Sequence, residues 1–407
     1  MKIYLVGGAV RDKLLQYPVK EKDWVVVGAT PEQMADLGYK PVGKDFPVFL
    51  HPQTKEEYAL ARTERKTAPG YKGFAFNTDE SVTLEEDLAR RDLTINAIAE
   101  DEKGNIFDPY HGQTDLELKL LRHVSPAFAE DPVRILRVAR FAARYKHLGF
   151  RVADETLELM KNMVQQGEVD ALVAERVWQE MQKALGEQHP EEFIHVLKAC
   201  GALQKILPEI DCLFGIPQPE CYHPEIDTGV HTIMVLQQAC QLSKNTVIRF
   251  AALVHDLGKG VTPKDILPSH RGHEERGVDV IKQLCNRLRI PNEYRDLAVL
   301  SSRFHLHLHR ALELKTTTLL KTLEQLDALR KPQRFEAFLT VCLADIRGRK
   351  GSENCEYPQM DYMRQACDAI KNVEIDDLKQ QELSGADMAN AIRERRLKAL
   401  KQIKKPG

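Results

Sequence analysis

GGAVRDKLLQYPVKEKDWVVVG, residues 7–28, is the stretch that decides the fold expected for the first part of the chain. An apolar run, Lys2–Val6, precedes this stretch. A double glycine and a short helix-forming segment separate that run from Trp24–Gly28, whose valines are typical of a buried strand. Glu21 and Asp23 lie two positions apart where this strand begins. Because alternate residues of an extended chain point to the same face, we expect both carboxylates on one side of the strand.

Two carboxylates this close raise each other's pKa unless a cation lies between them. Hard oxygen ligands on a short strand suit Mg²⁺, whose coordination shell phosphate oxygens can complete. The turn at Gly7 and Gly8 offers backbone N–H groups to an anion, and Arg11 adds a guanidinium beside it. This combination is what nucleotidyl transfer requires. Taken alone, however, the acidic pair also fits a solvated turn that binds nothing.

The composition is that of a globular protein without extreme charge. The chain has 407 residues, of which 43% are hydrophobic and 29% charged, and its net charge is -2. This excludes a uniformly basic nucleic-acid binder but not a local basic groove. The eight cysteines form no C-x-x-C pair, and no apolar run reaches the length that a bilayer requires. We therefore expect a cytoplasmic protein with reduced thiols and no membrane segment.

Strand signals fill roughly the first hundred residues and almost vanish after Asp131, where amphipathic helical patterns follow one another. The expected strands are Lys2–Val6, Trp24–Gly28, Phe46–Leu50, Glu57–Ala61 and Asn105–Asp108. Helical segments are expected at Arg11–Leu15 and Pro31–Leu37, the second with Thr30 as its N-cap. The Gly- and Lys-rich segment Arg65–Asp79 indicates a mobile loop.

Two motifs concentrate arginine after the first strands: LARRDLTINAIA (88–99) and EDPVRILRVARFAARY (130–145). On a helix, the four arginines of the second motif fall in an arc of about 120°; they are Arg134, Arg137, Arg140 and Arg144. We expect Val133, Leu136 and Phe141 on the opposite, packed face. Asp131 and Arg134, one turn apart, can present a hydrogen-bond acceptor and a donor fork to the edge of a base. An ordinary exposed basic helix is the alternative.

In this order, GGAVRD, the acidic pair before WVVVG, RRDLTIN and EDPVRILRVARFAARY resemble the bacterial class II CCA-adding enzymes. These tRNA nucleotidyltransferases build or repair the 3′-terminal C-C-A of tRNA from CTP and ATP. The resemblance covers roughly residues 1–150 and continues through the helical part, specifically in the multifunctional form that carries an HD domain. It implies an α+β fold: a polymerase-β-like nucleotidyltransferase head with a small mixed sheet, an all-α neck or body, and an all-α HD domain.

The expected domains are the head at 1–140, the helical neck and body at 141–226, the HD domain at 227–330 and a helical tail at 331–407. The Pro-rich segment 213–227 is the clearest internal boundary in the sequence. The neck is expected to help bind nucleotide and tRNA, whose acceptor arm would be recognised by shape rather than by sequence. Monomer and homodimer both remain open.

Carried over residue by residue, the resemblance implies nucleotide binding by Gly8 and Arg11 and Mg²⁺ binding by the catalytic pair Glu21 and Asp23. It further implies that Arg91, Arg137 and Arg140 bind the triphosphate or base, and that Asp131 and Arg134 select CTP or ATP. The superfamily pair is usually Asp-x-Asp, so Glu21 is a departure that implies a slightly altered metal geometry. Glu57 marks a position where a third carboxylate would fit.

A second chemical cluster lies in GVHTIMVL (229–236), AALVHDLGKG (251–260), RGHEERG (271–277) and FHLHLH (304–309), with a later acid in LADIRGRKG. This is the metal-binding order of HD phosphohydrolases. The expected ligands are His231, His255, Asp256, His273, His305 and Asp345, with His255 and Asp256 also catalytic. Imidazole mixed with carboxylate favours a transition metal, which supplies hydroxide to attack a phosphoester.

The resemblance implies nickel as this metal and 2′,3′-cyclic phosphates and 2′-phosphates as substrates. Gly258 and Gly260 are expected to close the helix that ends at the His-Asp pair. The alternation of His305, His307 and His309 also fits a partly exposed strand or loop, which would not bind metal.

Three functions therefore compete. The first is a bifunctional enzyme that adds C-C-A to tRNA and hydrolyses phosphoesters at the HD site. The second is a poly(A) polymerase, disfavoured by the HD constellation and because a basic C-terminal extension beyond the short tail KALKQIKKPG is not expected. The third is a tRNA-binding relative with an inactive head, for which the departure at Glu21 is the only support.

Overall fold

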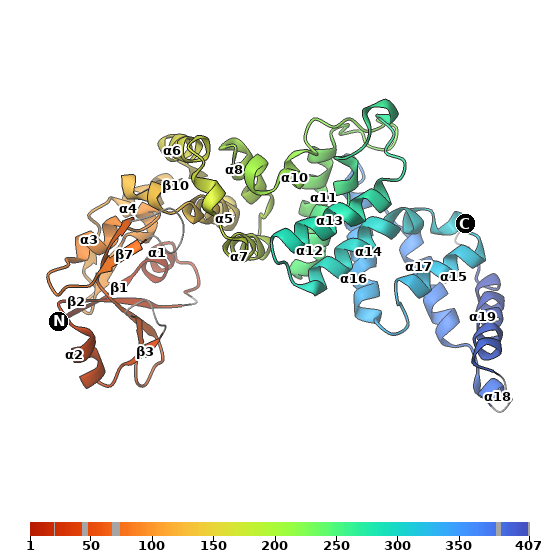
Figure 1. Ribbon diagram of the computed structural model, residues 1–407, viewed down its shortest axis with the longest axis horizontal. Helices are drawn as coiled ribbons and strands as arrows, with labels where there is room; N and C mark the ends of the chain where they lie inside the picture. The colour runs from red at the N-terminus through yellow and green to blue at the C-terminus, as the bar shows by residue number, and fades with distance from the viewer. Residues whose placement is uncertain (20, 43–47, 67–73, 380–383, 406–407) are drawn as a thin grey trace. The chain divides into compact units, whose positions relative to one another are not determined.

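The structure is a computed structural model that describes residues 1–19, 21–42, 48–66, 74–379 and 384–405 (Figure 1). The chain divides into two compact units, Met1–Ile206 and Leu207–Gly407, which are described separately below. Among the described residues, none of the helices has both the length and the apolar character needed to cross a membrane.

The first unit is built on a seven-stranded mixed sheet whose strand order is β3-β4-β5-β2-β1-β8-β9. The strands are β1 Lys2–Val6, β2 Asp23–Val27, β3 Lys40–Val42, β4 Val48–Leu50, β5 Glu57–Leu60, β8 Ala99–Asp101 and β9 Ile106–Phe107. Strands β2 and β5 run parallel, whereas every other neighbouring pair is antiparallel. The expected small mixed sheet is therefore confirmed.

Alternation of apolar residues explains why the two central strands form. Val6 on β1 and Val25 on β2 are buried in one core cluster, while Val26 belongs to a second cluster on the other face of the sheet. Because neighbouring residues of a strand point to opposite faces, apolar side chains cover both faces of the sheet. The pattern fixes the register of the two strands, in which Val6 pairs with Asp23, so that Asp23 lies beside the last residue of β1.

Short helices follow the strands. They are α1 Gly8–Leu14, α2 Pro31–Asp36, α3 Leu84–Ala89 and α4 Gly112–Leu118. Helix α2 begins as predicted, because the Thr30 side chain accepts a hydrogen bond from the Gln33 backbone N–H and forms a capping box. Strands β6 (Thr63–Lys66) and β7 (Phe74–Asn77) pair as a hairpin within the segment where a mobile loop was expected, and residues 67–73 lie outside the description. Residues 46 and 47 of the expected strand at Phe46–Leu50 are likewise undescribed.

The rest of the first unit is helical apart from a short parallel pair, β10 Leu120–Leu121 and β11 Arg151–Val152. Its helices are α5 Val133–Tyr145, α6 Asp154–Gln165, α7 Ala174–Leu185, α8 Glu191–Ala199 and α9 Ala202–Ile206. Helix α5 packs against α7 and α8, and most of its residues are buried, Arg134 and Arg140 among them. The alternative of an exposed basic helix is therefore wrong.

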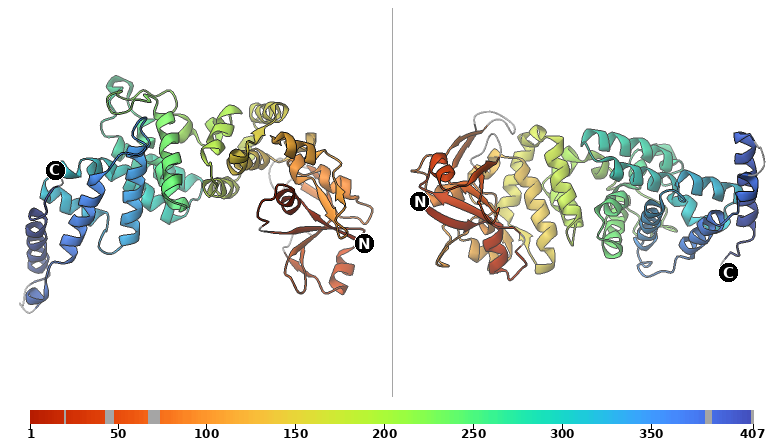
Figure 2. Two further views of the ribbon diagram at one scale, coloured as in Figure 1. Left: turned by 180° about the vertical axis from the view of Figure 1, so that it is seen from behind. Right: turned by 90° about the horizontal axis from the view of Figure 1, so that it is seen from below.

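The second unit contains helices and no β-strand among its described residues (Figures 1 and 2). The helices are α10 Pro208–Asp211, α11 Thr228–Leu242, α12 Thr246–Val254, α13 His273–Arg287, α14 Asn292–His309, α15 Thr316–Gln325, α16 Pro332–Arg347, α17 Pro358–Lys371, α18 Asp376–Lys379 and α19 Gly385–Lys401. Helix α12 packs against α11, α14 and α16, and α13 packs against α14. The alternative that residues 304–309 form a strand or loop is wrong, because they end helix α14.

Two observations bear on the expected domain boundaries, which stay a prediction. Helix α5 crosses the expected boundary at 140, and α16, which begins beyond residue 330, packs against three helices of the expected HD domain. The Pro-rich segment 213–227 lies inside the second unit, whose first residue is Leu207.

Gly258 and Gly260 do not adopt the left-handed conformation that typically closes a helix. Gly258 instead allows a close approach between the turn after α12 and helix α13. A Cβ atom at Gly258 would lie 2.0 Å from the backbone oxygen of His273 and 2.5 Å from the backbone nitrogen of Gly277. Both contacts are with backbone atoms, which cannot move aside as a flexible side chain can.

We therefore expect Gly258→Ala to lower the free energy of unfolding of the second unit by about 3 kcal/mol, as overpacking against backbone does. Differential scanning calorimetry would measure the loss as a lower melting temperature. Gly385→Ala is the matched control, because a Cβ at Gly385 meets nothing within 4 Å, and it should change stability by less than about 1 kcal/mol. Equal melting temperatures for the two variants would contradict the packing role of Gly258.

Candidate functional sites

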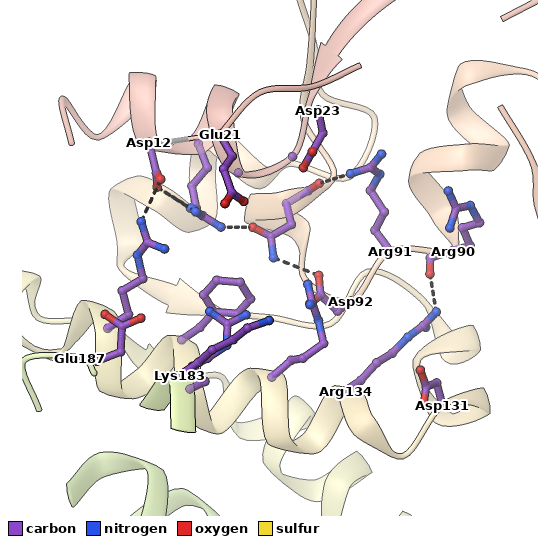
Figure 3. A pocket seen from close by; sticks show the side chains of 18 of the residues that line it. Asp12, Glu21, Asp23, Arg90, Arg91, Asp92, Asp131, Arg134, Lys183 and Glu187 are labelled. Carbon is purple, nitrogen blue, oxygen red and sulfur yellow. Dashed lines mark hydrogen bonds and ion pairs between the residues drawn. The ribbon is translucent and has the colours of Figure 1, made fainter. Parts of the chain in front are cut away.

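A cavity of about 830 Å³ opens in the first unit between the sheet and helices α5 and α7 (Figure 3). All nine residues that the sequence predicted for nucleotide and magnesium binding line it. They are Gly8, Arg11, Glu21, Asp23, Arg91, Asp131, Arg134, Arg137 and Arg140. Nine arginines and one lysine face six carboxylates in its lining, so the cavity suits a ligand with several negative charges.

The two predicted metal ligands enter this cavity from the sheet. Asp23 is the first residue of β2, and Glu21 lies two residues before it. Figure 3 shows both carboxylates turned toward the space beside Arg91 and Asp92. Burial raises the pKa of Asp23, Glu21 adds to the rise, and the guanidinium groups of Arg91 and Arg137 oppose it. A cation between the two carboxylates would remove this repulsion, so the pair fits a divalent metal.

Glu57 stands directly opposite Asp23 on the parallel strand β5. Paired residues of neighbouring strands point to the same face of a sheet, so the register brings the two carboxylates to one side. Glu57 is exposed, however, and is not among the residues that line the cavity. Its role as a third carboxylate stays a prediction.

Asp92 fixes the arginines of the cavity in place. Its Oδ2 accepts a hydrogen bond from Nε of Arg137 at 2.6 Å, and its Oδ1 accepts from Nδ2 of Asn96 at 2.9 Å and from the backbone N–H of Leu93 at 2.8 Å. Burial alone would raise the pKa of Asp92, but Arg137 and these hydrogen bonds hold it well below its usual range. Asp92 is therefore an ionised carboxylate that joins the RRDLTIN motif to helix α5.

Arg11 is held by the same network. Its Nη1 donates to Oδ1 of Asn96, and its Nε donates to Oδ1 of Asp12 at 2.8 Å. Asp12 also accepts hydrogen bonds from Arg144 at 3.0 Å and from the hydroxyl of Tyr145 at 2.7 Å, both on α5. The guanidinium of Arg11 thus has a fixed plane beside the Gly7-Gly8 turn, where Gly7 has a φ of 68° and accommodates the close approach of Arg91.

The structure changes the expected partners of Asp131 and Arg134. Asp131 accepts two hydrogen bonds from the guanidinium of Arg176, at 3.2 and 2.8 Å, in a bidentate pair. Arg134 donates to the backbone oxygens of Ala127 at 2.8 Å and of Arg90 at 2.5 Å. Both side chains line the cavity, but each is held by a partner that the sequence did not indicate.

Phe141 was expected on a packed face of α5 opposite the arginines; it is buried as expected, but its place opposite the arginines is wrong. It lines the cavity together with the arginines, and the Cζ of Arg140 lies 4.4 Å from the centre of its ring. At 100° per residue, Phe141 falls inside the arc that the arginines occupy, so the helical spacing itself contained this signal. Arg140 also donates from Nε to Glu180 on α7 at 2.6 Å.

Sequence reasoning missed several residues of the cavity. They are Asp12, Arg62, Arg90, Asp92, Asn96, Phe141, Arg144, Arg176, Lys183 and Glu187. Asp12, Asp92 and Asn96 lie inside the motifs quoted above, so the motifs contained them. Lys183 and Glu187 belong to no motif and reach the cavity only because α7 packs on α5.

The second unit has a cavity of about 850 Å³. Its lining includes four of the six predicted metal ligands, Asp256, His273, His305 and Asp345, and the fully buried His231 and His255 lie directly behind them. The Nε2 atom of His231 is 3.2 Å from Asp345, and the Nε2 atom of His255 is 3.3 Å from Asp256. The structure thus brings all six predicted residues together, from α11, α13, α14, α16 and the turn after α12.

The six residues form two groups that could each hold an ion. The ligand atoms of His231, His255 and Asp345 lie within 4.8 Å of one another, and so do those of Asp256, His273 and His305. Four buried atoms of these residues form no hydrogen bond within the described chain: both ring nitrogens of His231, Nε2 of His255 and Oδ1 of Asp256. Such unsatisfied buried atoms are costly unless something binds them, so the donor set fits a metal.

Charges inside this cluster perturb each other strongly. Burial would lower the pKa of His255, but the carboxylates of Asp256 and Asp345 outweigh it and raise the pKa to about 9. Burial lowers the pKa of His305 well below its usual range. Buried imidazole and carboxylate groups with opposed pKa shifts are typical of a functional site.

Sequence reasoning missed several polar residues around this cluster. They are Gln218, His223, Glu225, Lys259, His270, His309 and Arg349. Nζ of Lys259 lies 2.7 Å from Asp256 and donates to Gln218 at 2.9 Å, and Nε2 of His309 lies 2.7 Å from Asp345. Lys259 lies in the quoted segment AALVHDLGKG, whereas Gln218 and Glu225 lie in the segment expected to be a domain boundary.

Three family descriptions match successive parts of the chain. "Poly A polymerase head domain" matches residues 3–122, "Probable RNA and SrmB- binding site of polymerase A" matches 149–213, and "HD domain" matches 228–334. The matches follow the order head, helical region and HD helices.

Close relatives cover the whole chain. A "Multifunctional CCA protein" of Thioalkalivibrio sulfidiphilus is 65% identical over 404 residues, which are 99% of this chain and 99% of the relative. That of Teredinibacter turnerae is 63% identical over 404 residues, 99% of this chain and 98% of the relative. That of Nitrosococcus oceani is 60% identical over 402 residues, with the same two shares.

Solved structures share the fold at low identity. A CCA-adding enzyme in complex with ATP has a TM-score of 0.64 at 20% identity and covers 98% of this chain and 86% of that chain. The Thermotoga maritima CCA-adding enzyme complexed with tRNA has a TM-score of 0.62 at 19% identity, covering 100% of this chain and 88% of that chain.

The low pKa of Asp92 predicts a pH dependence of stability. A carboxylate whose pKa is depressed by folding stabilises the fold above its unfolded pKa of about 3.9, and this contribution is lost as the pH falls below that value. We expect Asp92→Asn to lower the free energy of unfolding of the first unit by about 1–3 kcal/mol at pH 7. The difference from the wild type should shrink as the pH falls from about 5 to 2.

Urea unfolding followed by tryptophan fluorescence would measure this difference, because Trp24 and Trp178, the two tryptophans of the chain, both lie in the first unit. Asp36→Asn, at an exposed position on α2, is the control and should leave stability nearly unchanged at every pH. A loss for Asp92→Asn that did not vary with pH would contradict an ionised, paired Asp92.

Proposed function

The chain belongs to the family of multifunctional CCA proteins, and we propose that the two cavities divide the chemistry of this family between them. The protein is a tRNA nucleotidyltransferase that adds C-C-A and carries an HD phosphohydrolase domain. One observation carries the proposal: the nine residues predicted for nucleotidyl transfer line a single cavity of the first unit, and the six predicted for hydrolysis gather in the second unit.

In the first cavity, Glu21 and Asp23 would hold a divalent metal, and we propose Mg²⁺ because both ligands are hard oxygens. When bound, such an ion would supply charge neutralisation to the triphosphate, whose α-phosphate the terminal hydroxyl of tRNA attacks with pyrophosphate leaving. The longer side chain of Glu21 reaches the same space as that of Asp23, since both turn toward it in Figure 3. The departure from Asp-x-Asp is thus compatible with activity.

The arginines of this cavity bind the nucleotide. We assign Arg11, Arg91 and Arg137, together with the backbone at Gly8, to the triphosphate, because fixed guanidinium forks match phosphate oxygens. Arg137 is fixed by Asp92, and Arg11 is fixed by Asp12 and Asn96. Binding therefore requires little ordering of long side chains, which would otherwise oppose it. Arg140 lies against Phe141 and can contact base or phosphate.

Selection of CTP and ATP is assigned to Asp131 and Arg134. Two backbone carbonyls hold the guanidinium of Arg134, and Arg176 holds the carboxylate of Asp131 through two hydrogen bonds. A donor and an acceptor with fixed orientations can recognise the hydrogen-bonding edge of a base without a nucleic-acid template. Arg176 is therefore proposed to orient Asp131.

In the second cavity, the two groups around Asp256 and Asp345 would hold a transition metal, because imidazole and carboxylate together suit such ions. We propose nickel. His231, His255, Asp256, His273, His305 and Asp345 would hold this metal, which would supply a water of lowered pKa for hydrolysis of a 2′,3′-cyclic phosphate or a 2′-phosphate. Lys259, Arg349 and the exposed Arg310 line this cavity and would receive the phosphate oxygens.

The partners proposed are tRNA, CTP and ATP, and a tRNA substrate indicates a cytoplasmic protein. The description of the head family does not distinguish C-C-A addition from poly(A) synthesis. The full-length relatives make this distinction, because they are multifunctional CCA proteins at 60% to 65% identity.

Asp23→Ala should lower nucleotide addition by at least about a thousandfold, because it removes a metal ligand at the reacting triphosphate. Hydrolysis of 2′,3′-cyclic AMP should persist. The assay combines a tRNA transcript that lacks C-C-A with labelled CTP and ATP. His255→Ala or Asp256→Ala should give the reverse result. Asp36→Ala, at an exposed position on α2, should retain both activities. Loss of both activities in any one of the first three variants would contradict the division between two sites.

Arg134→Lys should impair the choice between CTP and ATP more than the overall rate. Lysine keeps the charge but loses the planar fork that two carbonyls hold in place, so misincorporation should rise about tenfold or more. Sequencing of the added nucleotides measures it. Arg151→Lys, at a side chain that is 66% exposed, is the control and should add C-C-A faithfully. Unchanged fidelity in Arg134→Lys would remove Arg134 from base selection.

A further inference from the structure

The segment 213–227 supplies polar groups to the second site, although its prolines suggested only a domain boundary. Glu225 and His223 come from this segment and meet His231 on α11. The Oε1 atom of Glu225 lies 2.9 Å from Nδ1 of His231, and the side chain of Glu225 is only 2% exposed. Burying a carboxylate costs free energy unless a charge or a hydrogen bond compensates it, so the position of Glu225 next to a proposed metal ligand needs a physical explanation.

His231 lies between two carboxylates. Its Nδ1 faces Glu225, and its Nε2 lies 3.2 Å from Oδ1 of Asp345 and 3.9 Å from Oδ2 of Asp256. The ring is fully buried, and neither nitrogen forms a hydrogen bond within the described chain, so the close contact of Nδ1 with Glu225 is an ion-pair distance rather than a completed hydrogen bond. Because one nitrogen faces the acid and the other faces the cluster, the partner of Nδ1 determines which lone pair is available for a metal.

We propose that Glu225 is a positioning residue of the hydrolytic site: it fixes the tautomer and orientation of His231, with Nδ1–H toward Glu225 and the Nε2 lone pair toward the metal. A carboxylate behind a ligating histidine raises the basicity of the ligand and fixes its ring. The inference rests on the function proposed above for the second site.

Several contacts hold Glu225 where this role requires it. Nε2 of Gln218 donates to its Oε1 at 3.4 Å, the backbone N–H of Lys350 donates to its Oε2 at 3.3 Å, and Nδ1 of His223 lies 3.1 Å from Oε1. The carboxylate thus has partners on both oxygens. It is oriented by groups from two separate segments of the second unit, one that precedes α11 in the chain and one that follows α16.

The backbone after Glu225 is strained in a way that fits this placement. Ile226 has a φ of 60°, a left-handed conformation that a β-branched residue rarely adopts and that costs about 1–3 kcal/mol. Asp227 then fixes the chain, because its side chain accepts hydrogen bonds from the backbone N–H groups of Val230 and Gly215. The turn therefore places the side chain of Glu225 next to His231 just before α11 begins.

A different reading makes Glu225 itself a ligand, since Glu225, His223 and His231 also place ligand atoms within 4.8 Å of one another. If Nε2 of His231 also binds the metal of the main cluster, the ring would then bind ions through both nitrogens, which requires the loss of both ring protons. Positioning needs no such step, so the geometry favours it. The two readings differ in the number of ions bound.

The test uses the full-length protein, stripped of metal and kept in excess Mg²⁺ so that the first site does not compete. Titration calorimetry with NiCl2 gives the dissociation constant and the number of ions. We expect Glu225→Gln to raise the dissociation constant about 10- to 100-fold, as loss of a carboxylate behind a ligating histidine does, without changing the number of ions. Glu225→Asp, which keeps the charge on a shorter side chain, should fall between wild type and Glu225→Gln.

Glu220→Gln is the matched control, because Glu220 is exposed in the same segment, and it should bind nickel as the wild type does. C-C-A addition by each variant reports that the chain is intact, and circular dichroism reports folding of the second unit. If Glu225→Gln fails to fold, the weakened binding expected of Glu225→Asp carries the test.

Nickel affinity equal to wild type in Glu225→Gln would overturn the inference, and so would loss of one whole ion with the remaining affinity unchanged. In either case the wild type would still hydrolyse 2′,3′-cyclic AMP, so the function proposed for the second site would stand. A wild-type protein that neither bound nickel nor hydrolysed this substrate would instead overturn the proposed function, and the inference with it.

Discussion

The first site depends on one constraint: a carboxylate removed from water must have its charge compensated. Asp92 satisfies it with Arg137, Asn96 and the backbone of Leu93. Because Asn96 also accepts from Arg11, this single buried charge fixes two guanidinium groups from different elements. The cavity thus has its positive charge arranged before any nucleotide arrives, which is the condition for effective electrostatic stabilisation of a transferring phosphoryl group.

The second site obeys the same constraint with a different outcome. Six histidine and aspartate side chains are buried together, and the protein leaves some of their atoms without hydrogen bonds. Lys259 and His309 compensate part of the charge of Asp256 and Asp345. What remains is a set of buried lone pairs close to one another, which a cation would satisfy. The packing that creates this cluster is tight enough that Gly258 has no room for a Cβ atom.

Local patterns in the sequence predicted only those residues of both cavities that lie in the quoted motifs, because each motif places its side chains on one element. Partners from distant elements were not predictable. Arg176 reaches Asp131 only through the packing of α7 on α5, and Glu225 reaches His231 through a turn whose strained residue, Ile226, carries no sequence signal. Prolines in 213–227 indicated a boundary because they break helices, yet the same rigidity holds Gln218 and Glu225 against the metal cluster.

The donor sets of the two sites differ in the kind of cation that they suit. The first site offers carboxylate oxygens at the edge of a sheet, with arginines in place of further ligands, so the substrate's own phosphates must complete the coordination of a hard cation. The second offers imidazoles and carboxylates in a buried cluster that can bind a borderline cation before substrate arrives. Each set of donors comes from residues of one unit, so the two sites share no ligand.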